Sequence, residues 1–391
     1  MLLPLTTKIP LLSFFTGGGF LDIGFEQAGF EVPWSNECNP EFAAIYAAGV
    51  TSWRRSANRK AEAAKVSSIK SIAELKAEDI LKQAFPGKVP ELFGVVGGPP
   101  CSDFSAGGLH AGHNGENGQL TEVYVNMLKA LNPSFFLLEN VPHLESHPKH
   151  GPIFKTLLEK LDTAGYAFVS TKLNSLEFGV PQDRTRLFVV GFRRDLLRSW
   201  YPNEPFPKRA LETHFKWPTP TYPNAKAQFT WPGKSPFRGK PGKPEAIPVE
   251  LCVCSALAPN PVTFPNGKEW FKPKSKKFKT IQEGDVSGKS FKRLHRFRYS
   301  PTAWYGNNEV HLHPTKARRL SVREALRLQT VPDSYIMPAD STLSAKFKVI
   351  CNGVPFLLAT KIAEQIADFI SFSAKNRDPS RNGAGTHNNG R

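Results

Sequence analysis

The stretch that decides the fold is Val95-Val96-Gly97-Gly98-Pro99-Pro100-Cys101-Ser102-Asp103-Phe104-Ser105. Its first residues belong to an apolar run, which is typical of a strand in a sheet that is covered on both faces. The glycines allow backbone or ligand to approach closely, and the prolines stiffen the turn. Open α/β sheets place their chemistry at the carboxyl ends of such strands, so we expect Cys101 to be functional. A small cysteine buried in a core turn is the alternative, and the rest of the chain argues against it.

The chain opens with a predicted strand, glycine turn and helix. Residues 11–15 form the strand, Thr16-Gly17-Gly18-Gly19 the turn, and residues 20–29 the helix. Such a unit begins nucleotide-type α/β domains, because glycines let a cofactor lie against the main chain and the helix N-terminus offers unpaired N–H groups. A second strand ends in Glu37, where these folds bind ribose hydroxyls; a solvated surface glutamate is the alternative.

Two later stretches place polar groups beside the same sheet. Residues 133–138 predict a buried strand that ends in Glu139, an acid placed like Cys101 at a carboxyl end. Residues 178–186 carry Arg184 and Arg186 on an extended segment, which points alternate side chains to one side. Between the second strand and Val95, residues 40–85 are expected to be mainly helical.

The charge of the chain predicts its partner. The 391 residues include 51 Lys and Arg against 34 Asp and Glu, a formal net charge of +17. This excess favours a polyanion, with nucleic acid ahead of an anionic membrane; a basic protein without such a partner is the alternative. The five cysteines form no disulfide framework, which favours the cytoplasm, and no metal site is expected. No apolar run approaches the roughly 20 residues of a membrane helix.

The composition changes after about residue 194. Residues 195–310 are rich in Pro, Gly, Lys and Trp, and in residues 271–279 and 291–299 basic residues alternate with aromatic ones. That pattern suits backbone phosphates and exposed bases; a flexible solvated loop is the alternative. From these runs we select as DNA-contact candidates Lys274, Lys276, Lys277, Arg296 and Arg298. A Ser-capped helix follows at about residue 321, an amphipathic helix ends near residue 370, and the tail, 376–391, is expected to be disordered.

A thiol, a carboxyl group and arginines suit alkylation of cytosine at C5. That carbon is a poor nucleophile until a thiolate adds to C6 and makes the ring electron-rich. A carboxylic acid can donate a proton to N3, and an arginine can bind O2 as charge accumulates. Because the ring lies inside a duplex, it must first be flipped out.

The motifs, taken in order along nearly the whole chain, resemble those of the DNA (cytosine-5) methyltransferases. Cys101 matches the nucleophile, Glu139-Asn140-Val141 the motif whose acid contacts N3, and Gln182-x-Arg184-x-Arg186 the segment whose last arginine holds O2. Gln182 and Ser105 are further DNA-contact candidates. Residues 319–329 resemble the helix that supports the recognition region.

The resemblance implies S-adenosylmethionine as cofactor, with its adenine against Phe15 and its ribose at Glu37. The cofactor-binding candidates are Phe15, Thr16, Gly17, Gly19, Phe20, Glu37, Pro99, Leu120, Asn352 and Val354. The implied fold is a Rossmann-like α/β domain over residues 1–194, completed by residues 346–375, with a smaller, basic target-recognition domain over residues 195–345.

Some positions depart from the family pattern. Phe20 stands where another Gly is frequent, Ser102 replaces Gln, Asn117 replaces Arg and Cys351 replaces Gly. Ser68-Ile69 occupies the place of the acid that contacts the adenine amino group, with Asp79 as a weaker candidate. These changes affect efficiency more than reaction type, because thiol, acid and arginines are all present.

The expected function is methylation of cytosine C5 in a specific duplex sequence. A tRNA cytosine methyltransferase and a DNA-binding relative without catalysis are the alternatives, although the long basic segment favours duplex DNA. We further expect a monomer in a prokaryotic cytoplasm, with a restriction or defence system as a possible associate.

Overall fold

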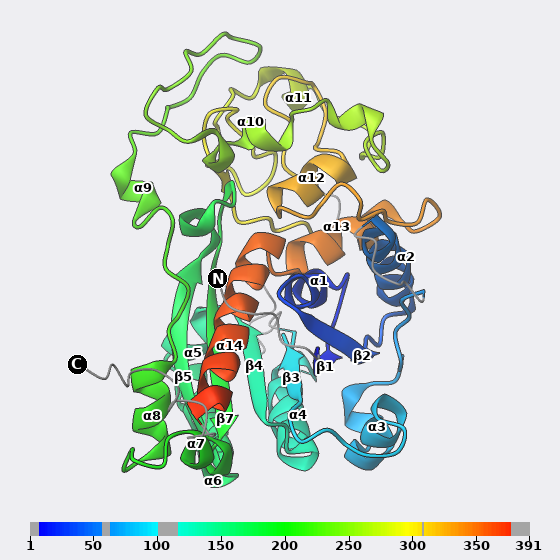
Figure 1. The fold of residues 1–391 in the computed structure, drawn as a ribbon. Coiled ribbons are helices and arrows are strands. Elements are labelled where there is room, and N and C mark those ends of the chain that lie inside the picture. Colours follow the sequence, from blue (N-terminus) through cyan, green and yellow to red (C-terminus); the bar gives the residue numbers. More distant parts are fainter. Residues whose placement is uncertain (1–7, 57–62, 101–115, 307–308, 377–391) are drawn as a thin grey trace, which may run out of the picture.

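The computed structural model describes residues 8–56, 63–100, 116–306 and 309–376, and its fold is drawn in Figure 1. Six strands form the central sheet in the order β2-β1-β3-β4-β7-β5. The bounds of these strands are β1 (Ile9–Phe14), β2 (Phe30–Asn36), β3 (Gly94–Gly97), β4 (Phe135–Asn140), β5 (Tyr166–Asn174) and β7 (Thr185–Arg193). The first four strands of that order are parallel, and β7 is antiparallel to both of its neighbours. The predicted α/β sheet is therefore present.

Helices cover both faces of the sheet (Figure 1). Alternate strand residues face opposite cores: Leu11 and Leu137 belong to one, Leu12 and Leu138 to the other. The first core is completed by α1 (Phe20–Gln27), α7 (Arg194–Trp200), α8 (Pro207–His214) and α14 (Phe356–Asn376). The second is completed by α3 (Ala77–Ala84), α4 (Glu116–Leu131), α5 (His143–Ser146) and α6 (His150–Thr163). Burial on both faces explains why the strands are apolar at nearly every position.

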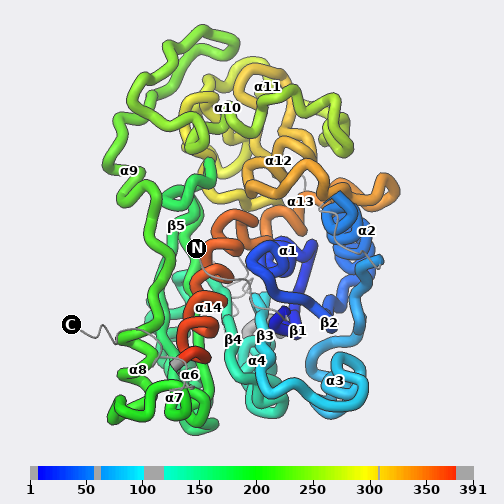
Figure 2. Tube along the Cα trace, in the orientation of Figure 1, coloured from blue at the N-terminus to red at the C-terminus, as the bar shows by residue number. Residues whose placement is uncertain are grey.

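The two ends of the described chain meet in the first core. Figure 2 shows the red helix α14 running beside the blue helix α1. Their contact is close, because a Cβ added to Gly24 in α1 would lie 2.6 Å from the Cβ of Ala359 in α14. The final helix therefore packs against the first helix of the sheet domain, and completion of this domain by residues 346–375 stays a prediction.

Helical structure over residues 40–85 is less continuous than expected. Helix α2 (Pro40–Ser56) and α3 are present, but residues 63–71 are extended, with a single 3₁₀ turn at Ile72–Glu74. The prediction was wrong there because this segment pairs with the end of β2: Ser67 N donates to Ser35 O at 2.9 Å. Backbone pairing at the sheet edge prevails over local helix propensity.

The remaining elements form the upper part of the molecule in Figure 1. They are short: β6 (Gln182–Asp183), α9 (Ala225–Gln228), α10 (Val253–Ala256), α11 (Lys277–Thr280), β8 (Ser300–Pro301), α12 (Val322–Leu328), α13 (Leu343–Asn352) and 3₁₀ turns at Ser175–Phe178, Val249–Leu251 and Pro261–Thr263. Helix α12 begins at a capping box in which Ser321 and Glu324 exchange hydrogen bonds, which confirms the predicted Ser cap. None of the helices in the described ranges has the length and hydropathy needed to cross a membrane.

Residues just beyond 194 pack with the sheet. Leu197, Leu211 and Phe215 join the same core as Phe369 of α14. The division expected at residue 194 stays a prediction, and we propose that the structural transition falls near residue 217. A third core contains residues of α1, α2, α12 and α13, so the two parts of the molecule share an apolar contact.

Candidate active site

The loop that leads to Cys101 is held against Glu139. Strands β3 and β4 are parallel, with Gly97 opposite Leu138, so the chain leaves both at the same edge of the sheet. Asn140 Nδ2 donates to Pro99 O at 3.4 Å. A Cβ on Gly98 would lie 2.7 Å from Glu139 Oε2, so a larger residue here would displace the carboxyl group. Cys101 and Ser105, like Ser102 and the tail at 377–391, lie outside the described residues.

Glu139 forms an ion pair with Arg186. Arg186 Nε lies 3.2 Å from Glu139 Oε1, and the two side chains are only 14% and 11% exposed. Burial raises the pKa of the Glu139 carboxyl, while the charges of Arg186 and Arg184 oppose that rise. Both arginines thus lie near the same carboxyl, in agreement with their alternation in the sequence. The carboxyl can hold a proton at higher pH than an exposed glutamate, beside a fixed cation.

Arg184 joins this pair to the C-terminal motif. Its side chain is buried, and its Nη2 donates to Asn352 O at 3.3 Å. Asn174 fixes its backbone by accepting from Arg184 N at 3.2 Å. Gln182 is also fully buried: its Oε1 accepts from Ala303 N at 3.5 Å, while its Nε2 has no hydrogen-bond partner among the described residues. The role of Gln182 in DNA contact stays a prediction.

The glycine turn is tied to the acid that ends the second strand. Glu37 accepts from Gly17 N at 3.0 Å and from Asn39 N at 2.9 Å. Burial raises the pKa of Glu37, and these backbone donors limit the rise. Gly19 takes a φ of 75° at the start of α1, and Phe15 takes a φ of 54°, which is rare for a residue with a side chain. Strain of this kind typically marks a binding turn.

Two buried hydroxyls, one in this turn and one in α4, lack hydrogen-bond partners among the described residues. They are Thr16 Oγ1 and Thr121 Oγ1. Thr121 belongs to α4, whose Tyr124 ring packs 6.1 Å from the ring of Phe15. Leu120, the neighbouring candidate, packs against the same core. Buried hydroxyls without partners are unfavourable unless a ligand satisfies them, so this site has the features of a polar ligand site.

The segment after β2 lies next to Glu37. Ser68 O accepts from Glu37 N at 3.2 Å and from Asn36 Nδ2 at 2.9 Å. Ile69 follows with 59% of its surface exposed. That Ser68-Ile69 takes the place of the acid that contacts the adenine amino group stays a prediction, and Asp79, the weaker candidate, lies exposed in the first turn of α3.

The C-terminal motif packs against the same turn through Phe20. A Cβ on Gly353 would lie 2.3 Å from the Phe20 ring, so the phenyl group that departs from the family pattern is accommodated by this glycine. Val354 is buried nearby, and Asn352 is exposed. Tyr335, which no motif singled out, contacts Phe20 and the glycine turn. Asp22, also missed, lies buried in α1 and accepts from Ser13 Oγ at 2.7 Å.

The basic residues of the recognition segment fall into two groups. Lys274, Lys276 and Lys277 are exposed, as a phosphate contact requires. Arg296 instead donates to Glu283, a fully buried acid, at 2.9 and 2.7 Å, and to Gly239 O at 3.0 Å. The guanidinium of Arg298 lies 5.0 Å from the centre of the Tyr299 ring. The alternating pattern therefore contains structural arginines as well as exposed cations, and the DNA contacts stay predictions.

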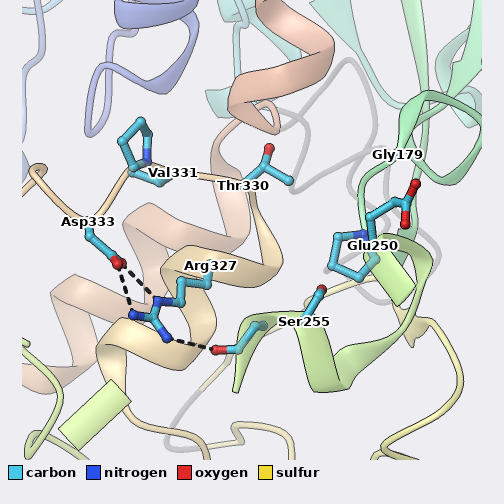
Figure 3. A pocket seen from close by; sticks show the side chains of 10 residues that line it. Gly179, Glu250, Ser255, Arg327, Thr330, Val331 and Asp333 are labelled. Atoms are coloured by element: carbon cyan, nitrogen blue, oxygen red, sulfur yellow. Dashed lines mark hydrogen bonds and ion pairs between the residues drawn. The ribbon is translucent and has the colours of Figure 1, made fainter. Parts of the chain in front are cut away.

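A cavity of about 310 Å³ lies between the Gly179–Pro181 turn and the recognition segment (Figure 3). Arg327 and Asp333 form one wall, joined by two hydrogen bonds of 2.8 Å. Its lining contains neither Glu139 nor the glycine turn, so this cavity is separate from the candidate catalytic groups.

Comparison with known proteins identifies the class. A family model described as C-5 cytosine-specific DNA methylase matches residues 9–368. The Type II methyltransferase M.NmeDI of Neisseria meningitidis serogroup C is 38% identical over 371 residues, which cover 93% of this chain and 84% of the relative. M.FnuDI of Fusobacterium nucleatum, another Type II methyltransferase, is 30% identical over 373 residues, covering 93% and 96%.

A solved Escherichia coli structure, described as a prophage-encoded DNA modification methyltransferase, shows the same fold. Its TM-score is 0.62 at 22% identity, over 93% of this chain and 99% of that one. The chain belongs to the C-5 cytosine-specific DNA methylase family and is an enzyme of that class. The resemblance and the α/β fold inferred from the motifs are thereby confirmed.

Proposed function

We propose that this enzyme transfers a methyl group from S-adenosylmethionine to C5 of a flipped-out cytosine in a specific duplex DNA sequence. The observation that carries the proposal is the buried ion pair of Glu139 and Arg186, 3.2 Å apart, at the sheet edge where the Cys101 loop begins. A carboxyl group and a guanidinium group side by side match the adjacent N3 and O2 atoms of cytosine.

Each residue has a defined task in this reaction. The Cys101 thiolate forms a bond to C6, and the ring electrons move towards N3, where Glu139 supplies a proton, and O2, which Arg186 binds. The C4–C5 π pair of the resulting enamine would then bond to the methyl carbon as the bond between that carbon and the donor sulfur breaks, and N3 would return its proton to Glu139. Loss of the C5 proton and elimination of the thiolate restore the ring. Arg184 supports the pair electrostatically, and Asn140 holds the Pro99 end of the loop.

The glycine turn fits the proposed methyl donor. Glu37 would accept from the ribose hydroxyls, Phe15 would pack on the adenine, and the unpartnered hydroxyls of Thr16 and Thr121 could satisfy polar atoms of the donor. S-adenosylmethionine supplies an electrophilic methyl group on a sulfonium. Of the remaining candidates, Gly17, Gly19, Phe20, Pro99 and Val354 would shape the site.

Duplex DNA is the proposed partner of the recognition segment. Its exposed lysines, with the chain's net charge of +17, suit phosphate contacts. Several relatives are named Type II methyltransferases, a class that works beside restriction nucleases, and we extend that association to this chain, acting as a monomer on DNA in the cytoplasm.

The test is base-resolution cytosine methylation sequencing of DNA from a methylation-free bacterial host that expresses the chain, beside Cys101→Ser. Methylation at one short recurrent sequence, absent from the variant, is the expected result and would also define the target. Full methylation by Cys101→Ser would overturn the mechanism. If DNA is unmodified with both proteins, the proposal that DNA is the substrate fails, and the same assay would then be applied to tRNA.

A further inference from the structure

Trp304 is a large aromatic residue that the fold leaves 56% exposed. It belongs to a segment of the recognition region, residues 300–305, that is hydrogen-bonded to the start of the Gln182-x-Arg184-x-Arg186 motif. Strand β8 pairs in parallel with β6, with Ser300 opposite Gln182. Thr302 Oγ1 then donates to Asp183 O at 2.6 Å. The backbone that carries Trp304 is thus attached to β6, the short strand that immediately precedes Arg184.

The residues on either side of Trp304 are buried. Ala303 is 3% exposed and its N donates to Gln182 Oε1, while Tyr305 is 2% exposed and packs its ring 5.4 Å from that of Phe347. With both neighbours buried, the exposed side chain of Trp304 points away from the protein interior. Its exposure therefore follows from how this segment is anchored.

The segment that carries Trp304 also contacts the C-terminal motif, which is bonded to Arg184. Cys351 Sγ lies 4.0 Å from Tyr305 O and 3.4 Å from Asn352 Oδ1, and Asn352 O accepts from Arg184. The positive charge of Arg184 opposes the rise in pKa that burial causes at both the Tyr305 hydroxyl and the Glu139 carboxyl. Phe206, the residue just before α8, is another exposed aromatic residue and serves as a comparison.

We propose that Trp304 stacks its indole on a base of the duplex beside the position that the target cytosine leaves. This inference rests on the proposed function. When a base leaves the helix, the faces of its neighbours lose their stacking partner, and an apolar side chain that occupies the gap stabilises the opened duplex. The indole offers a large π surface, and the bonds of its segment to β6 hold that segment next to the strand that leads into Arg184.

The experiment compares the full-length wild type with Trp304→Ala, Trp304→Phe and the control Phe206→Ala. The DNA probe is a short duplex that carries the motif read from the methylation map, with 2-aminopurine in place of the target cytosine. Stacking on a base predicts that Trp304→Ala weakens duplex affinity by about 5-fold to 100-fold and lowers the 2-aminopurine signal of the flipped base. Trp304→Phe should recover part of both, and Phe206→Ala should match the wild type.

Titration with S-adenosylhomocysteine separates this effect from loss of fold, because donor binding should be unchanged in all variants. A Trp304→Ala protein that binds and flips the duplex like the wild type would overturn the proposal. If Trp304→Ala does not fold, tryptophan fluorescence of Trp304→Phe provides the test. Equal quenching by DNA in the wild type and Trp304→Phe would also overturn the proposal. A wild type that neither binds nor opens the duplex would instead refute the proposed function.

Equal acrylamide quenching of wild type and Trp304→Phe without DNA would show that another segment of the chain covers the indole, and that result too would overturn the stacking role.

Discussion

The hydroxyl of Tyr335 donates to the carbonyl oxygen of Gly18 at 2.7 Å, across 317 residues of sequence. Its ring packs edge-on against Phe20, with centroids 5.4 Å apart. A Cβ on Gly49 would lie 2.0 Å from the same ring, so α2 also needs a glycine here. A tyrosine that follows α12 thus fixes the turn that opens the sheet domain. We regard Tyr335 as a positioning residue for the methyl donor.

Replacing Tyr335 with Phe should weaken binding of S-adenosylhomocysteine by about 2-fold to 10-fold, because one buried hydrogen bond contributes about 0.5–1.5 kcal/mol. The ring and its packing remain, so the free energy of unfolding should fall only by the worth of that hydrogen bond, about 0.5–1.5 kcal/mol. Titration calorimetry and urea unfolding measure the two effects. Tyr222→Phe, which removes an exposed hydroxyl bonded to Glu250, is the matched control. Lower stability with unchanged binding would show a role in packing alone.

Glu139→Gln should lower the rate of methylation about 100-fold to 10,000-fold, because the amide keeps the shape but cannot deliver a proton to N3. Burial raises the pKa of Glu139, so its proton is retained to higher pH and the wild-type rate should fall as pH rises through that pKa. The variant should lack this decline. Single-turnover rates across pH test both points, with Glu145→Gln, an acid paired with Lys172, as control. A variant within tenfold of wild type would contradict the assigned role.

Sequence patterns located the groups that lie at strand ends. The apolar runs before Pro99 and Glu139 predict adjacent buried strands, and the parallel register then brings their carboxyl ends together. The glycine turn and Glu37 were found in the same way, and Gly17 N does donate to that acid. These residues were predictable because each lies at the carboxyl end of a strand or just beyond it.

Contacts between distant side chains left no comparable signal. Nothing in the sequence around Tyr335 indicates that its hydroxyl reaches Gly18, because such a bond depends on how α12 and α1 pack. The recognition segment has no helix or strand period, so the pattern of its basic residues could not distinguish exposed Lys276 from Arg296, which is paired with Glu283. Alternation of basic and aromatic residues indicates a basic segment, but it does not indicate which basic residues are paired with acids inside the protein.

Asp22 should make stability depend on pH. Burial raises its pKa to about 6, and Glu26 adds to the rise, while Ser13, Tyr46 and Arg54 oppose it. Because the folded pKa exceeds the unfolded one, the stabilisation from the bound proton is full below the unfolded pKa and is lost as pH rises through about 6. Asp22→Asn removes this titration.

The free energy of unfolding of Asp22→Asn, relative to wild type, should therefore increase by about 1 kcal/mol from about pH 5 to about pH 7. Urea unfolding at each pH gives the difference, and Asp340→Asn, at an exposed site, should show no such trend. A constant difference across this range would mean that Asp22 does not titrate in it.

Arg296→Gln should destabilise the protein by about 3 kcal/mol, because it leaves Glu283, which is 0% exposed, as an unpaired buried charge. The matched control is Lys276→Gln, an exposed cation whose loss should change stability by less than about 0.5 kcal/mol. In DNA binding the lysine should matter more than the arginine. If Lys276 contacts a phosphate, Lys276→Gln should lower the salt dependence of binding by about one counterion.

The double variant Arg296→Met with Glu283→Leu should recover most of the lost stability, since it removes both charges of the pair. Urea unfolding and DNA titration over a range of salt concentrations measure these effects. If Arg296→Gln kept wild-type stability and instead lost the salt dependence, Arg296 would be a DNA contact and its ion pair with Glu283 would be dispensable. The two residues therefore separate a structural arginine from a DNA-binding lysine within one basic segment.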